Sequence, residues 1–201
     1  MDFKIHLEKA WHLTLKHLAS LIIMTLVMTA LSFLTLSILA PVMLAGYFFS
    51  LLLLVREGRE PKIQDLFSQM NLFLPLFLLS LLVIFALMVG FKLFFLPGIA
   101  VLCFVTFGCI YILPLMIDKR LGILDAIKTS WQMAIQGNVA DHIVVVILFM
   151  GLMSIGSSVF IGTLFTQPFA TIFILSVYLE RTAGDSYGAT VITNSFPDDE
   201  K

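Results

Sequence analysis

Long apolar stretches separated by short charged segments make up most of this chain. The first stretch runs from Leu18 to Val55 without one charged residue. Because about 20 apolar residues of helix cross a bilayer, it is long enough for two spans, with Pro41 near the start of the second. Further spans are predicted at about residues 74–91, 97–118, 143–161 and 168–179. The pattern predicts an all-α integral membrane protein with six transmembrane helices in three hairpins.

Amphipathic segments precede each predicted hairpin. Apolar residues recur at helical spacing over residues 2–17, 62–74 and 123–137, with charged and polar residues between them. Such a stripe is typical of a helix that lies along a membrane surface. We therefore expect an amphipathic interfacial helix before each of the three hairpins.

The same order of segments occurs three times: a surface helix, a span, a turn marked by proline, a shorter span and a charged segment at its end. It divides a single polytopic domain, residues 1–181, into units at 1–61, 62–121 and 122–181. The turns are marked by Pro41, Pro97 and Pro168. Because any membrane hairpin needs such features, true duplication and independent similarity both stay open. Residues 182–201 are predicted to form a polar, mobile cytoplasmic tail.

Charge sets the expected location and orientation. All but one of the 12 Lys and Arg residues lie in the N-terminal segment, two inter-span segments or the tail; the exception is Lys92. Because basic loops stay on the cytoplasmic side, we expect a multi-pass protein of the bacterial cytoplasmic (inner) membrane with both termini in the cytoplasm. The chain is 60% hydrophobic and 12% charged, which is outside the usual range of soluble domains. A net charge of −1 gives no indication of a nucleic-acid partner.

The predicted spans lack residues that could carry catalysis. No span interior contains Asp, Glu or His, and neither a P-loop nor a GxGxxG motif occurs. Intramembrane proteases and proton-coupled transporters need such groups within the membrane. The sequence therefore predicts a protein without enzymatic activity, cofactor or metal site.

Three groups of residues are candidates for particular roles. Basic residues and tryptophans beside the spans are expected to contact the interface and lipid headgroups; they are Trp11, Lys16, Arg56, Arg59, Lys119, Arg120, Lys128 and Trp131. Small residues at steps of four favour close helix packing, with a polar pathway as the alternative; they are Ala86, Gly90, Ser154, Ser158 and Gly162. The residues expected to form turns or kinks are Pro41, Pro97, Gly98, Pro114 and Pro168. Beside the bilayer itself, the expected partner is an anionic lipid or another membrane protein.

One part of the chain carries a family resemblance. It consists of Leu96-Pro97-Gly98-Ile99, then Leu113-Pro114-Leu115-Met116-Ile117-Asp118-Lys119, then Gly122-Ile123, Ala126 and Ser130-Trp131. This part resembles the YciC-like bacterial inner-membrane proteins and, more loosely, the membrane domain that accompanies some glycerophosphodiesterases. In those families a Pro-Gly opens one helix, a Pro and an Asp-Lys end it, and a Gly-led surface helix follows. The resemblance implies the six-span plan and no particular activity.

Two functional hypotheses follow. The first is a non-enzymatic membrane protein that binds or organises lipid or partner proteins at its cytoplasmic face. The second is a small transporter or channel for a neutral or lipidic solute, with a path along hydroxyl groups of Thr25, Thr29, Thr106 and Tyr111. The hypotheses differ in whether the polar span residues converge on one cavity.

Overall fold

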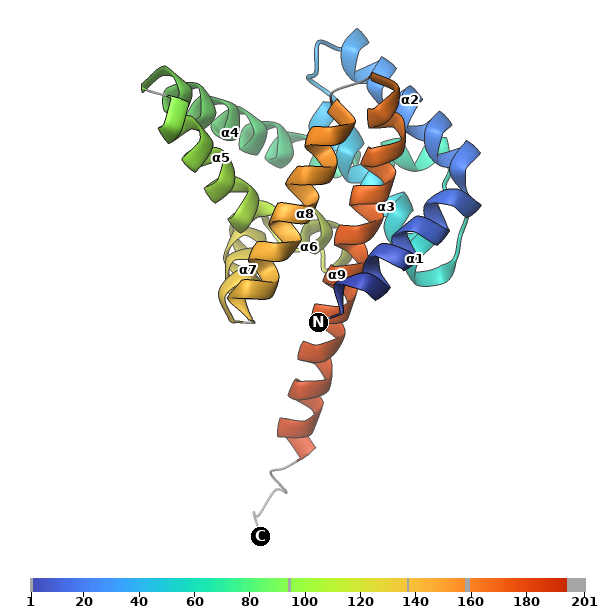
Figure 1. Cartoon of the computed structure of the whole chain (residues 1–201), viewed down its shortest axis with the longest axis vertical. Coiled ribbons are helices and arrows are strands. Elements are labelled where there is room, and N and C mark those ends of the chain that lie inside the picture. The colour runs from blue at the N-terminus through green and yellow to red at the C-terminus, as the bar shows by residue number, and fades with distance from the viewer. Residues whose placement is uncertain (1, 94, 137, 158–159, 195–201) are drawn as a thin grey trace.

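Every regular element is helical in the computed structural model, which describes residues 2–93, 95–136, 138–157 and 160–194. The helices are α1 (Phe3–Lys16), α2 (Leu18–Leu34), α3 (Ala40–Glu57), α4 (Phe73–Leu93), α5 (Phe95–Cys109), α6 (Ile112–Asp118), α7 (Ile123–Gln136), α8 (Val139–Ser157) and α9 (Phe160–Asn194). The consecutive helices that contact each other include α2 with α3, α4 with α5 and α8 with α9 (Figure 1).

Several helices are able to cross a membrane. Within the described residues, five segments are long and apolar enough: Ala40–Glu57, Ile63–Lys92, Gly98–Asp118, Val139–Gly156 and Gly162–Ala183. Helices α1 and α2 reach this length only together, and they are bent by 86° where they meet. The chain is therefore a helical membrane-spanning protein, while the arrangement of six spans stays a prediction.

Helix α9 forms the centre of the fold. Its segment from Phe169 to Tyr178 is buried at every position. Helices α1, α2, α3 and α8 all contact α9. A helix that is buried on all sides is surrounded by protein rather than by lipid. This part of α9 is therefore the central helix against which the other four pack.

Helix α4 has the opposite character. Only 6% of the apolar 18-residue stretch within Ile63–Lys92 is buried inside the protein, against 61% of the corresponding stretches in Ala40–Glu57 and in Gly162–Ala183. Two of its residues were predicted to pack, and of these Gly90 is buried and Ala86 is half-buried. In Figure 1, α4 and α5 extend together away from the other helices. The apolar surface of α4 is therefore available to lipid.

The predicted amphipathic helices at 2–17 and 123–137 are present as α1 and α7, but the prediction of one at 62–74 is wrong. That segment forms two 3₁₀ turns, η1 (Ile63–Phe67) and η2 (Met70–Leu72). The Ser50 hydroxyl donates to the Asp65 carboxylate at 2.7 Å, and the Ser68 hydroxyl donates to the Asp65 carbonyl oxygen at 2.7 Å. Side chains that bond the nearby backbone compete with a regular α-helix, and the Ser50 contact holds the segment against α3.

Pro114 interrupts the fourth span, as predicted. Helix α5 ends at Cys109 and α6 begins at Ile112. A proline has no N–H to donate to the carbonyl four residues earlier, and its ring clashes with that carbonyl. In this chain the carbonyl belongs to Ile110, which lies in the break.

The other predicted turns fall into two groups. Pro41 lies at the start of α3, and Pro97 and Gly98 lie in the first turn of α5, as expected. The prediction of a turn at Pro168 is wrong, because α9 begins at Phe160 and passes through Pro168. Membrane helices accept an internal proline where neighbouring groups satisfy the freed carbonyl.

The last helix is longer than its predicted span. Helix α9 continues beyond the predicted unit boundary at residue 181 and ends at Asn194. The predicted tail, residues 182–201, therefore begins within a helix, and its residues 195–201 lie outside the described ranges. Helix α8 ends at Ser157, so the predicted end of the fifth span at residue 161 is also wrong.

Candidate functional site

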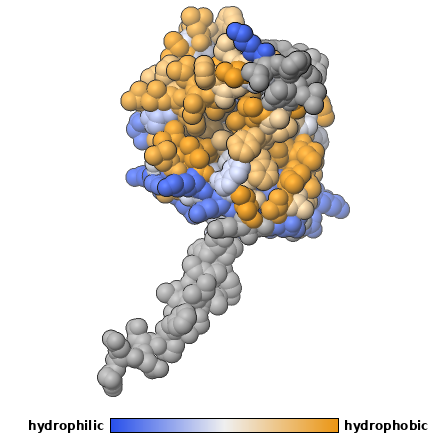
Figure 2. Space-filling view, turned by 90° about the vertical axis from the view of Figure 1, so that its left-hand side faces the viewer, coloured by the Kyte–Doolittle hydropathy of each residue, from blue (hydrophilic) through white to orange (hydrophobic). Residues whose placement is uncertain are grey.

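The ends of α3 and α6 meet the middle of α9 in a cluster of polar side chains. Arg56 Nη1 lies 2.8 Å from Asp118 Oδ1, and the Tyr178 hydroxyl donates to Asp118 Oδ2 at 3.0 Å. These three residues come from three different predicted units, and we call the end of the molecule that they occupy the charged end. Figure 2 shows that hydrophilic residues gather in the lower part of one face of the surface, while apolar residues cover most of the remainder.

Helix α7 is held against α9 through Arg181. Its Nη1 donates to the carbonyl oxygen of Met133, near the end of α7, at 2.7 Å. The guanidinium carbon of Arg181 also lies 5.6 Å from the centre of the Tyr111 ring. A cation near the last carbonyls of a helix is favourable, so α9 holds the end of α7 in place.

Helix α1 packs lengthwise on α9. His6 Nδ1 lies 2.6 Å from Ser176 Oγ, and His6 Nε2 contacts the Glu180 carboxylate. The ring of Trp11 meets the rings of Phe165 and Phe169 edge to face, at centroid distances of 5.7 and 6.1 Å. Trp11 is still 51% exposed, so this predicted interfacial residue is both a packing residue and available at the surface.

Trp131 lies at the contact between α7 and α5. A Cβ atom at Gly108 would lie 2.7 Å from the indole, so the absence of a side chain at Gly108 makes room for it. The Ser130 hydroxyl donates to the Gly108 carbonyl oxygen at 2.6 Å. The Phe104 and Phe107 rings lie 5.1 and 6.0 Å from the indole, centre to centre. The sequence analysis identified Trp131 but missed Gly108, the residue against which the Trp131 indole packs.

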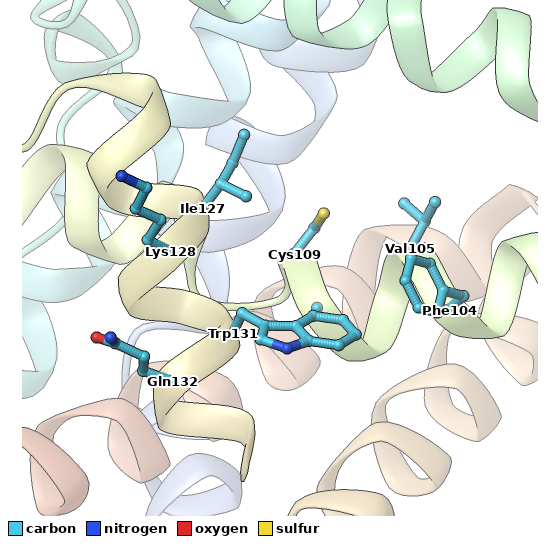
Figure 3. A pocket seen from close by; sticks show the side chains of 8 residues that line it. Phe104, Val105, Cys109, Ile127, Lys128, Trp131 and Gln132 are labelled. Atoms are coloured by element: carbon cyan, nitrogen blue, oxygen red, sulfur yellow. The ribbon is translucent and has the colours of Figure 1, made fainter. Parts of the chain in front are cut away.

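A pocket of about 470 Å³ opens beside this contact. In Figure 3 the Trp131 indole points from α7 toward α5, where Phe104 and Val105 lie. The polar ends of Lys128 and Gln132 point to the other side of α7. The pocket is thus apolar inside and edged by polar groups; its lining consists of Phe104, Val105, Gly108, Cys109, Ile127, Lys128, Trp131 and Gln132. We call it the α5–α7 pocket.

The predicted interfacial cations divide into two groups. Arg56 and Arg59 each contact a carboxylate, of Asp118 and Asp65 respectively. A second group is exposed and forms no ion pair with any described residue; it consists of Lys16, Lys119, Arg120 and Lys128. Only the second group has its charge available for an external anion.

The predicted packing stripe of Ser154, Ser158 and Gly162 does not lie on one helix. Ser154 is on α8 and is exposed, Gly162 is on α9, and Ser158 lies outside the described residues. The close approach of α8 to α9 occurs instead at Gly156, where a Cβ atom would lie 1.7 Å from Thr166 Oγ1. Gly162 does take part, since its Cβ would lie 2.9 Å from the Gly156 carbonyl oxygen.

Gly46 is a packing residue that sequence reasoning missed. A Cβ atom there would lie 2.3 Å from the Leu66 carbonyl oxygen and 2.5 Å from that of Asp65. Ser50, four residues later on the same helix, donates to the Asp65 carboxylate. Two small residues at this spacing are a known signal of close packing in membranes, and here they receive the 3₁₀ turn η1.

A second cavity of about 260 Å³ lies between α3, α5, α8 and α9. Its polar lining comes from Thr106, Gln167 and Thr171, and the rest is apolar. It shares Val105 and Cys109 with the α5–α7 pocket, so one side of α5 separates the two. The residues of the predicted hydroxyl path that do not line it are Thr25, Thr29 and Tyr111.

Other observations do not add to these sites. Among the residues that the structure describes, no group of three or more His, Cys, Asp or Glu could hold a metal ion. In comparisons with protein families, curated proteins and solved structures, no match to this chain is found. The function of the protein is therefore inferred from its pockets and its charged end.

Proposed function

We propose that this protein binds phospholipid of the surrounding bilayer and catalyses no reaction. We place it in a bacterial inner membrane with its charged end and both termini in the cytoplasm, because basic segments stay on that side. The single observation that carries the proposal is the α5–α7 pocket, which is apolar inside and has Lys128 at its edge. The resemblance to YciC-like proteins supports the proposed membrane location and implies no particular activity.

The chemistry of the pocket suits one acyl chain. Its volume of about 470 Å³ lies within the usual range of small-ligand sites, about 300–1,000 Å³. Helix α5 belongs to a membrane-spanning segment, so the medium that meets the apolar walls is hydrocarbon rather than water. Because the Ser130 and Arg181 hydrogen bonds already fix α7, the site is formed before a lipid enters.

Lys128 supplies the headgroup contact. Its stem lines the pocket while its ammonium group points away from the indole (Figure 3). A lysine beside a membrane commonly extends its charge toward the headgroup layer in this way. One such cation contributes about 1 kcal/mol of attraction to anionic lipid. We therefore expect an anionic phospholipid to be preferred over a zwitterionic one.

Tryptophan fluorescence tests this proposal directly. The chain has two tryptophans, so Trp11→Phe leaves Trp131 as the only reporter, inside the pocket. In vesicles, phosphatidylglycerol with brominated chains should quench Trp131 more than brominated phosphatidylcholine does at equal mole fraction. An attraction of about 1 kcal/mol corresponds to a local enrichment of roughly fivefold.

Two further variants make the result specific. Lys128→Gln should remove the preference, whereas Lys16→Gln, which removes an equal charge from α1, should preserve it. Ile127→Phe should fill the pocket and reduce quenching by both lipids. Equal quenching by the two lipids, or loss of the preference in Lys16→Gln, would contradict the proposal.

A second candidate function is transport of a neutral or lipidic solute. The supporting observation is the cavity between α3, α5, α8 and α9, which contains Thr106, Gln167 and Thr171 and shares one wall with the α5–α7 pocket. A flux assay in sealed liposomes separates the candidates. Flux that falls in Thr171→Leu would favour transport, and absence of flux for neutral solutes and for lipid would favour binding alone.

A further inference from the structure

A further pocket lies at the charged end, and it shares no lining residue with the α5–α7 pocket. It is a hollow of about 480 Å³ between the segment Ser68–Leu72 and the end of α6. The buried residues Met116 and Ile117 form part of its floor. Ser68, Gln69, Asn71 and Arg120 supply polar groups to its lining. The pocket therefore combines an apolar floor with amide groups and one cation.

The charge of Arg120 is free to act on a ligand. Arg120 is exposed and forms no ion pair within the described part of the chain. Asp118, two residues before Arg120, pairs with Arg56, and Asp65, which precedes the segment Ser68–Leu72, contacts Arg59. Asp125, five residues after Arg120, forms no ion pair with it. An anion that enters the pocket consequently meets an uncompensated guanidinium.

The backbone at Arg120 is strained. Its φ is +51°, in the left-handed region that glycine adopts without a steric penalty. It follows Lys119, the C-terminal cap of α6, at the position where helices commonly place a glycine. A residue with a side chain costs about 1–2 kcal/mol there. Such strain often marks a functional position, and here it is accompanied by a side chain that lines a pocket.

The polar side chains of the lining beside Arg120 are Ser68, Gln69 and Asn71. The Ser68 hydroxyl already donates to the Asp65 carbonyl oxygen, so its proton is occupied. Gln69 uses one N–H for a 3.4 Å contact with Ser68 Oγ and keeps a second one. Asn71 forms no hydrogen bond with any described side chain. The pocket thus offers the Arg120 guanidinium together with amide N–H groups of Gln69 and Asn71.

We infer that this pocket binds a phosphate ester, with Arg120 as the main contact. A guanidinium matches two phosphate oxygens at once, and the two amides can donate to the oxygens that remain. Met116 and Ile117 would lie against the carbon atoms beside the phosphate. This inference rests on the proposed lipid binding for its setting, and it adds a specific headgroup site separate from Lys128 and Trp131.

The test measures binding to the full-length protein in mild detergent by native mass spectrometry. Phosphatidylglycerol should bind more tightly than diacylglycerol, which has the same chains without phosphate. Because a hydrogen bond to a charged group is lost, Arg120→Gln should weaken phosphatidylglycerol binding roughly tenfold. Lys119→Gln, which removes an equal charge at the preceding residue, should change it by less than about twofold.

Arg120→Gly separates binding from folding. It removes the guanidinium and also relieves the left-handed strain, so binding should fall while the melting temperature stays equal or rises. Equal weakening by Arg120→Gln and Lys119→Gln, or equal binding of diacylglycerol and phosphatidylglycerol, would overturn the inference.

Soluble glycerol phosphate identifies the source of the phosphate. If millimolar glycerol phosphate displaces phosphatidylglycerol in an Arg120-dependent manner, the site recognises the ester itself. If it does not, while the Arg120 dependence for lipid persists, the ligand is the lipid headgroup. Trp131 quenching should stay unchanged in Arg120→Gln. If lipid binding depends on Arg120 but Trp131 is quenched equally by phosphatidylglycerol and phosphatidylcholine, lipid binding in the α5–α7 pocket is contradicted, and phosphate binding at Arg120 is supported.

Discussion

Replacing Gly46 with alanine should detach the 3₁₀ segment from α3. The added Cβ would lie 2.3 Å from the Leu66 carbonyl oxygen, where ordinary contact begins near 3.4 Å, so the segment must move by about 1 Å. Overpacking of this kind costs about 1–3 kcal/mol. Moving the segment also weakens the hydrogen bond from Ser50 to the Asp65 carboxylate, worth about 1.5–3 kcal/mol. Alanine returns about 1 kcal/mol as a better helix former, which leaves a net loss of about 2–4 kcal/mol.

Thermal unfolding in mild detergent measures this loss. A chain of about this size shifts its Tm by about 2–4 °C for each kcal/mol, so Gly46→Ala should lower the Tm by roughly 5–15 °C. Hydrogen exchange should quicken at residues 62–72. Gly151→Ala is the matched control, because nothing lies within 4 Å of a Cβ at that position on α8, and its Tm should stay equal or rise. Equal Tm values for the two variants would refute the reasoning.

Two further predictions concern the charged end and the break in the fourth span. Asp118→Asn leaves Arg56 without its carboxylate and weakens the hydrogen bond from Tyr178, so the free energy of unfolding should fall by about 1.5–3 kcal/mol. A double-mutant cycle with Arg56→Gln measures the interaction, and additive losses would contradict a direct contact. Pro114→Ala restores an N–H that can donate to Ile110, so α5 and α6 should join. Hydrogen exchange at residues 110–114 should then slow, and unchanged exchange would show that the proline does not cause the break.

The spans were predictable because hydropathy is a local property. The stretch that follows Pro41 and the stretch that ends at Asp118 are apolar whatever they pack against, and both appear as segments able to cross a membrane. The break near Pro114 was also predictable, because a missing N–H acts on a carbonyl only four residues away. Features that depend on one residue and its near neighbours in the chain could thus be read from the sequence.

The failed predictions involve contacts between distant parts of the chain. At 62–74 the apolar spacing suits an α-helix, but Asp65 bonds to Ser50 on α3, and that contact fits a 3₁₀ turn. At Pro168 the expected turn gives way to a continuous helix that four other helices surround. No periodicity in one segment reveals which partner it will meet, and Gly46 and Gly108 were missed for the same reason.

The basic residues at the ends of the predicted spans differ in role, because only some of them are paired with a carboxylate. By sequence, Arg56, Arg59, Lys119 and Arg120 are equivalent signals of orientation. In the structure, the first two are paired with carboxylates: Arg56 joins α3 to α6, and Arg59 joins the loop after α3 to η1. Of these four residues and Lys128, the ones that form no ion pair with a described residue and line a pocket are Arg120, at the end of α6, and Lys128, on α7. If anionic lipid is recognised, the determinants should therefore concentrate around α6 and α7, and neutralising Arg56 should affect stability more than lipid preference.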